Sequence, residues 1–142
     1  MKEIERQIQE IVDRETRAWD TQDVELLLSI FHEDMVWPWP EKNTDHDPAN
    51  WVMVLGRFDH DRWKEFYTKF FEQYRLVHNR REIKKIAISE QNNGALAVVD
   101  IDTLWVNKET GEENHWKGRT SKGYSLVGSE WKMTMHTGVL QY

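Results

Sequence analysis

The chain has 142 residues, a length that fits one core, and we expect a single domain over residues 1–142. Its 19 basic and 25 acidic residues give a net charge of −6, which argues against a nucleic-acid surface. The absence of cysteine excludes disulfides, thiolate nucleophiles and Cys-based zinc sites. The charged N-terminus lacks an apolar signal region and no long apolar span follows, so we expect a cytoplasmic protein that does not contact a membrane.

Apolar residues at helical spacing predict three helices in the first half of the chain. The first runs from Ile4 to Trp19, and the second is short and ends near Glu33. The third follows Asp59 or Asp61 as its cap and carries a stripe of aromatic residues. Between the second and third helices, Pro residues predict an extended segment over 35–40, and the polar residues 41–57 predict a long ordered loop.

Beyond residue 75 the apolar pattern changes to the period of two that is typical of strands. A slip in this pattern over 83–86 predicts a β-bulge, and the Asn92-Asn93-Gly94 run predicts a hairpin turn. Consecutive hairpins then give an antiparallel meander. Its predicted strands are 76–89, 95–106, 113–127 and 130–140.

Three segments of the chain resemble the nuclear transport factor 2-like superfamily in its SnoaL-like branch: Ala18-Trp19-Asp20-Thr21-Gln22-Asp23, Phe31-His32-Glu33-Asp34-Met35-Val36-Trp37 and Trp131-Lys132-Met133. They are also similar to the association domain of calcium/calmodulin-dependent kinase. The resemblance implies a cone-shaped α+β fold, with three helices packed on a strongly curved antiparallel sheet. It further implies a deep pocket between the sheet and the helices, and a homodimer formed through the sheet. We expect a small-molecule ligand and no cofactor.

Ketosteroid isomerases of this fold place a tyrosine on the first helix and a basic aspartate just after the first strand. Matching along the Phe31 segment puts Glu15 and Trp39 at these places. The resemblance therefore does not carry the isomerase pair into this chain.

Asp100 and Asp102 are the first candidates for catalysis. Two residues apart on one strand, they share a face at about 7 Å separation. Their neighbours are apolar, so the carboxylates need either ionic partners or a hydrating pocket, and a raised pKa would make one of them a general base. The alternative is that neighbouring basic residues neutralise them: Arg80, Arg81, Arg119 or Lys122.

Two further polar residues lie on the following strands. Lys122 shares a face with Trp116 and is expected to point inward, where it could pair with an aspartate or bind an anionic group. His136 is a third catalytic candidate, although strand parity places it away from the core unless a bulge reverses it.

Eight Trp, five Phe and four Tyr are many for this length, and such rings line cores, pockets or interfaces. Around an acid they could hold a cation by their ring faces, whereas the alternative for each ring is core packing. The residues predicted to bind a ligand are Trp19, Trp37, Trp39, Trp63, Tyr67, Trp116 and Lys122.

Two runs, Asp45-His46-Asp47 and Asp59-His60-Asp61, have the residue types of a metal site. Helix capping explains the second, and adjacent residues rarely converge on one ion, so we expect no metal. The sequence thus predicts a pocket for a hydrophobic or aromatic ligand. It leaves open cofactor-free acid/base chemistry of the isomerase, cyclase or hydratase kind, or a non-catalytic binding or dimerisation module.

Overall fold

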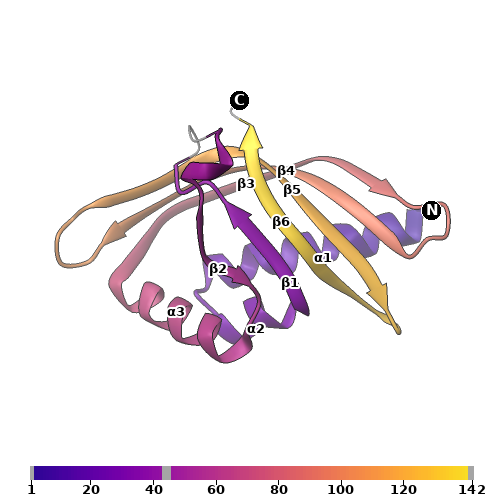
Figure 1. The fold of residues 1–142 in the computed structure, drawn as a ribbon, viewed down its shortest axis with the longest axis horizontal. Helices are drawn as coiled ribbons and strands as arrows, with labels where there is room; N and C mark the ends of the chain where they lie inside the picture. The colour runs from indigo at the N-terminus through magenta and orange to yellow at the C-terminus, as the bar shows by residue number, and fades with distance from the viewer. Residues whose placement is uncertain (1, 43–45, 141–142) are drawn as a thin grey trace.

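A computed structural model describes residues 2–42 and 46–140. Figure 1 shows a long, curved sheet with helices gathered on one side. The described helices are α1 (Lys2–Asp20), α2 (Val24–Ser29), the 3-10 turn η1 (Pro48–Asn50) and α3 (His60–Gln73). The strands are β1 (Phe31–Trp39), β2 (Val52–Arg57), β3 (Tyr74–Ile88), β4 (Gly94–Asn107), β5 (Glu113–Val127) and β6 (Glu130–Leu140).

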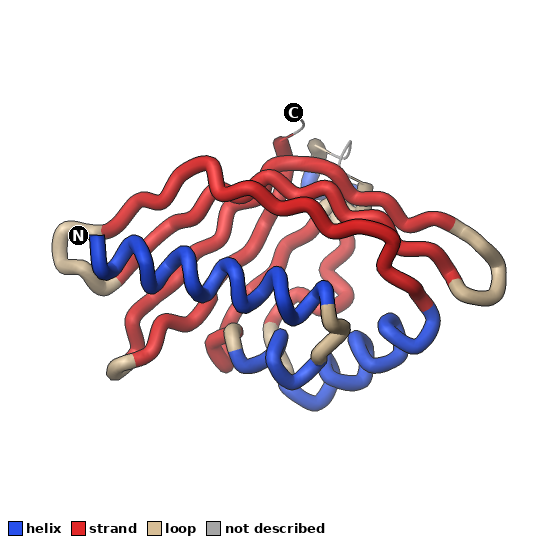
Figure 2. The backbone as a smooth tube through the Cα atoms, turned by 180° about the vertical axis from the view of Figure 1, so that it is seen from behind, coloured by secondary structure: helices blue, strands red, loops and turns tan. Residues whose placement is uncertain are grey.

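The α-helices form where the apolar periodicity predicts them, but the prediction that the second ends near Glu33 is wrong: α2 ends at Ser29 because strand β1 begins at Phe31. In α1 the buried side chains include Ile8, Ile11 and Trp19, which share one face of the helix. Asp59 caps α3 by accepting a hydrogen bond from the Arg62 amide at 2.9 Å. Figure 2 shows α1 crossing the sheet diagonally, with the two shorter helices beyond its C-terminal end.

The six strands form one mixed sheet in the order β2-β1-β6-β5-β4-β3. Strands β3 to β6 are an antiparallel meander, as predicted, whereas β1 pairs in parallel with β6. The prediction of a loop over 41–57 is wrong for residues 52–57, which form β2 on the edge of β1. That strand depends on pairing with β1, and its apolar run Val52-Met53-Val54-Leu55 is too short to identify a strand by itself.

Bulges bend the sheet at two places that matter for the site. The register of β3 against β4 shifts between Ile83 and Lys85, which confirms the predicted slip. The register of β5 against β6 shifts as well, because Gly123 pairs with Met135 while Tyr124 pairs with Met133. The extra residue in β6 reverses the facing of the side chains that follow it, up to a second register shift after Gly138.

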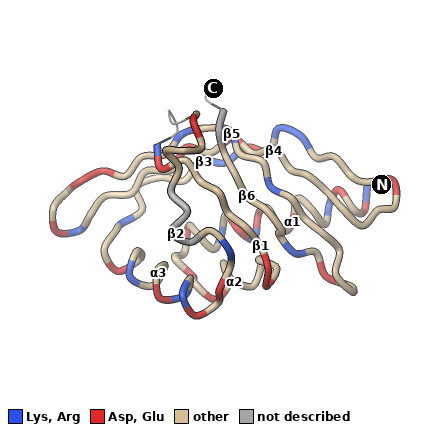
Figure 3. The backbone as a smooth tube through the Cα atoms, in the orientation of Figure 1, with Lys and Arg blue, Asp and Glu red and all other residues tan. Residues whose placement is uncertain are grey.

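The face of the sheet that meets the helices is called the inner face, and its opposite the outer face. Ala97, Val99 and Ile101 of β4 are buried on the inner face, whereas Leu96 is half exposed on the outer face. Acidic and basic residues are interspersed along the chain (Figure 3). No helix in the described residues has the length and apolar character needed to cross a membrane.

Candidate functional site

A cavity of about 400 Å³ lies between the inner face of the sheet and the helices. Volumes in this range hold small organic molecules. Most of its wall is aromatic, and a few polar groups interrupt it. The lining residues are Trp19, Trp37, Trp39, Glu41, Phe66, Tyr67, Phe70, Arg81, Ile101, Thr103, Trp105, Asn114, Trp116 and His136.

The aromatic wall is a set of rings in contact with one another. Trp37 and Trp39 alternate with Pro38 on β1, so both indoles reach the cavity, and their centroids lie 5.6 Å apart. Trp39 also lies 4.6 Å from Trp116, and Trp19 of α1 makes an edge contact with Tyr67 of α3 at 5.2 Å. The contacts fix the rings as flat walls that suit a planar ligand.

Beneath the rings lies a buried ionic network that joins α1 to the sheet. The ammonium of Lys122 is 2.9 and 3.0 Å from the two carboxylate oxygens of Glu15, and both side chains are almost fully buried. Arg81 of β3 donates from Nη1 to the same carboxylate at 3.0 Å, and Trp19 donates to it from Nε1 at 2.9 Å. The Glu15 carboxylate therefore accepts four hydrogen bonds within the core.

Arg81 is the cation of this network that also lines the cavity. Its Nε donates to the side-chain oxygen of Asn79 at 2.8 Å, and the same oxygen accepts a bond from Thr103. The guanidinium lies 5.8 Å from the centre of the Trp19 ring. Within the described part of the chain, Nη2 of Arg81 has no hydrogen-bond acceptor, so it can donate to a ligand.

The prediction that His136 faces away from the core is wrong, because the β6 bulge before it turns the side chain inward. Its ring lies 4.5 Å from that of Trp37 and 4.9 Å from that of Trp39. The Nζ atom of Lys122 lies 3.1 Å from Nε2 of His136. Among the described residues His136 Nδ1 has no hydrogen-bond partner.

The charges of these groups follow from burial and from one another. Burial raises the pKa of Glu15, but the charges of Lys122 and Arg81 outweigh it and hold that pKa well below its ordinary value. Burial lowers the pKa of Lys122 to about 8, against the opposing effect of Glu15. Burial and the Lys122 charge lower the pKa of His136 well below its ordinary value.

At neutral pH the network therefore holds one carboxylate against two cations, Lys122 and Arg81, with a neutral imidazole beside them. An ammonium is only a donor, so its bond to His136 Nε2 leaves the ring hydrogen on Nδ1. The network has an excess positive charge, and the buried Nδ1–H of its imidazole has no acceptor among the described residues. This arrangement suits an anionic or carbonyl oxygen.

Asp100 and Asp102 do not line this cavity, since their side chains lie on the outer face of the sheet. The carboxylate of Asp100 forms two bonds with Arg119, at 2.6 and 2.9 Å. Asp102 lies within 2.8 Å of imidazole nitrogens of His78 and His115. The alternative that a neighbouring basic residue neutralises the aspartates therefore describes Asp100, whose partner is Arg119.

The other predicted residues are divided between the cavity and the core. Trp19, Trp37, Trp39, Tyr67 and Trp116 line the cavity. Trp63 is fully buried and packs on Phe31 and Trp37, so it belongs to the core and does not line the cavity. Lys122 does not line the cavity either, because it is buried against Glu15.

The sequence did contain a signal for the network, which the prediction did not use. Glu15 lies within the apolar stripe of α1, between Ile11 and Ala18 at helical spacing. A carboxylate at such a position needs a buried cation. The sequence pattern predicted Arg81 only as a possible partner of Asp100 and Asp102, and not of Glu15.

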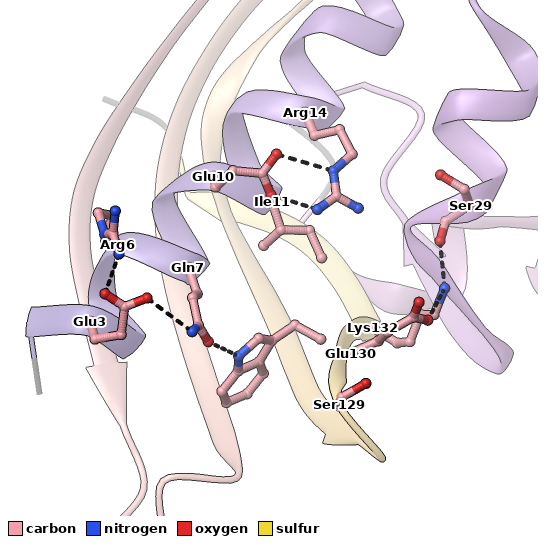
Figure 4. A pocket seen from close by; sticks show the side chains of 11 residues that line it. Glu3, Arg6, Gln7, Glu10, Ile11, Arg14, Ser29, Ser129, Glu130 and Lys132 are labelled. Carbon is pink, nitrogen blue, oxygen red and sulfur yellow. Dashed lines mark hydrogen bonds and ion pairs between the residues drawn. The ribbon is translucent and has the colours of Figure 1, made fainter.

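A groove of about 550 Å³ lies between the start of α1 and the β5–β6 hairpin (Figure 4). Its charged side chains pair with one another: Glu3 with Arg6, and Glu10 with Arg14. Lys132 donates to the carbonyl of Ser29 at 2.8 Å. These groups are largely exposed and already have partners, so the aromatic cavity is the better candidate site.

The curved sheet, the three α-helices on its inner face and the cavity between them define a nuclear transport factor 2-like α+β cone fold. Comparison with solved structures confirms the predicted fold. A nuclear transport factor 2-like superfamily protein from Salmonella enterica superposes with a TM-score of 0.69 at 17% identity, over 99% of this chain and 93% of that one.

Two other structures are similar over nearly their whole length. A protein from Novosphingobium aromaticivorans assigned as an aromatic ring hydroxylase has a TM-score of 0.74 at 21% identity, with 100% of this chain and 92% of that chain covered. A ketosteroid isomerase-like protein from Erwinia carotovora has a TM-score of 0.70 at 15% identity, with 94% and 93% covered. No family model and no curated protein matches the chain. At these identities the likeness establishes the fold.

Proposed function

We propose that the cavity binds a small aromatic molecule that carries an anionic or carbonyl oxygen, with that oxygen directed toward Arg81 and His136. The observation that carries this proposal is the excess positive charge beneath aromatic walls. Flat rings favour a planar ligand, and a partly desolvated guanidinium favours an oxygen anion. The similarity to a protein assigned as an aromatic ring hydroxylase is consistent with a ligand of this class.

The proposal is tested by mass spectrometry of any molecule that copurifies with the protein, followed by thermal-shift screening of aromatic carboxylates, phenols and neutral analogues. A ligand that binds only the folded state raises the melting temperature by mass action. We expect aromatic anions to raise it more than neutral analogues of the same shape. Greater stabilisation by the neutral compounds, or none by any aromatic compound, contradicts the proposal.

Proton transfer is a second candidate function, and the place of Glu41 favours it. This residue contributes an exposed carboxylate to the cavity wall, whereas His136 and Arg81 contribute donors. With a bound aryl ketone, the Glu41 carboxylate would take a proton from the carbon next to the carbonyl. The electron pair moves to the carbonyl oxygen, and the donors stabilise the resulting enolate.

The test of this second function is hydrogen–deuterium exchange of an aryl ketone in D₂O, followed by NMR. The protein should accelerate exchange, and Glu41→Gln should abolish the acceleration while ketone binding persists. No acceleration by the parent protein, or equal acceleration by the two proteins, contradicts this role of Glu41.

We also propose that the chain forms a homodimer through the outer face of its sheet. Leu96 and Met135 are exposed by 50% and 39%, and both pair with Gly123, one from each neighbouring strand. Apolar side chains that lie together on a sheet surface are typical of an interface. Sedimentation velocity should show a dimer that Leu96→Glu dissociates, and a monomeric parent protein contradicts the proposal.

A further inference from the structure

A cluster of two histidines and one aspartate lies on the outer face of the sheet, away from the cavity. His78 of β3 and His115 of β5 both pair with Leu104 of β4, one on each side of it. Asp102 is two residues before Leu104 and therefore shares its face. The register of three adjacent strands thus brings together side chains that are far apart in the sequence.

The geometry of this cluster is convergent. The Nε2 atoms of His78 and His115 lie 2.8 and 2.7 Å from the same oxygen of Asp102, and the three ligand atoms all lie within 4.8 Å of one another. The two rings are nearly perpendicular, with centroids 6.0 Å apart. Side-chain exposure rises from 18% for Asp102 to 25% for His78 and 48% for His115, so the cluster opens to solvent on one side.

We propose that His78, Asp102 and His115 form a binding site for a divalent transition-metal ion such as Zn²⁺. Imidazole nitrogen and carboxylate oxygen bind zinc at about 2.0–2.2 Å, which separates tetrahedral ligand atoms by about 3.4 Å. To reach that spacing, side-chain rotations would move the two imidazole nitrogens about 0.6–0.7 Å farther from the shared Asp102 oxygen. Three protein ligands leave a fourth position for water, on the side where His115 is exposed.

The residue types determine which ions fit. Two imidazoles and one carboxylate suit Zn²⁺, Co²⁺, Ni²⁺ or Cu²⁺, whereas Mg²⁺ and Ca²⁺ prefer oxygen ligands. Arg80 lies 3.9 Å from the other oxygen of Asp102 and is 75% exposed. Arg80 therefore does not occupy the Asp102 oxygen that the two histidines share, and replacing Arg80 should not abolish metal binding. The alternative is that the imidazoles merely donate hydrogen bonds to Asp102, without any affinity for metal.

The experiment is a Zn²⁺ titration of the untagged, metal-free protein in competition with a chromogenic chelator. We expect one ion per chain for the parent protein. Loss of a partner that only supports a metal ligand costs about 10–100-fold in affinity, so loss of a ligand, in His78→Gln or His115→Gln, should cost at least about 100-fold. The matched control is His60→Gln, since His60 is an exposed histidine at the start of α3 and should not affect binding.

A second measurement separates metal binding from any effect on folding. Zn²⁺ should raise the melting temperature of the parent and of His60→Gln, but not that of His115→Gln, whereas Mg²⁺ should have no effect on any of them. The proposal is overturned if the parent competes for Zn²⁺ no better than His115→Gln. It is also overturned if His60→Gln loses binding to the same extent.

Discussion

Replacing Glu15 by Gln removes the single negative charge of the buried network while its shape is preserved. Lys122 and Arg81 then lie in the core with a neutral amide between them. Breaking a buried ion pair by removing one partner costs about 3–5 kcal/mol, because an uncompensated charge remains. We expect a loss of this size, which at about 1.5–2 kcal/mol per M of urea lowers the unfolding midpoint by about 2 M.

The assay is urea unfolding followed by tryptophan fluorescence, with Glu10→Gln as the control. Glu10 lies on the same helix and pairs with Arg14, but its side chain is 49% exposed, so its loss should cost about 0–1 kcal/mol. In the double variant Glu15→Gln/Lys122→Met, stability should partly recover, because one of the two unpaired cations is gone. Equal losses for Glu15→Gln and Glu10→Gln would refute the account of the network.

Three further outcomes are expected, for the titration of Glu15 and for substitutions at Gly138 and Asp102. Because the folded-state pKa of Glu15 lies below its ordinary value of 4.5, its stabilisation is present above that pH and is lost as the pH falls below it, so acid titration should destabilise the parent more steeply than the Glu15→Gln variant. Gly138→Ala places a Cβ 2.8 Å from the Trp116 ring and should cost about 1–3 kcal/mol in urea unfolding, whereas Gly123→Ala, with no atom nearer than 3.5 Å, should cost less. Asp102→Asn should leave ligand affinity in calorimetry unchanged because its side chain lies outside the cavity, and a tenfold loss would show that the outer face contributes to binding.

The sequence predicted most of the fold because apolar period, caps and turns are local signals. The three α-helices, the β3 bulge and the meander all follow from such signals. Strand β2 and the parallel pairing of β1 with β6 do not, because they depend on contacts between distant segments.

The site was harder to predict for two physical reasons. Both faces of β4 carry apolar residues, so alternation alone could not assign Asp100 and Asp102 to the outer face. One extra residue in β6 reverses the side to which His136 points. The aromatic wall was predictable, since Trp37 and Trp39 share a face whichever way the segment faces.

We expect Arg81 to confer a preference for aromatic anions, which calorimetric titration with 2-naphthoate and its uncharged amide measures. A hydrogen bond to a charged group contributes about 1.5–3 kcal/mol, so the parent protein should bind the carboxylate at least about tenfold more tightly. Arg81→Gln should abolish that preference. Arg80→Gln, which alters the adjacent exposed arginine, should retain it. Equal affinity for the two compounds in the parent, or a preference that survives in Arg81→Gln, contradicts this expectation.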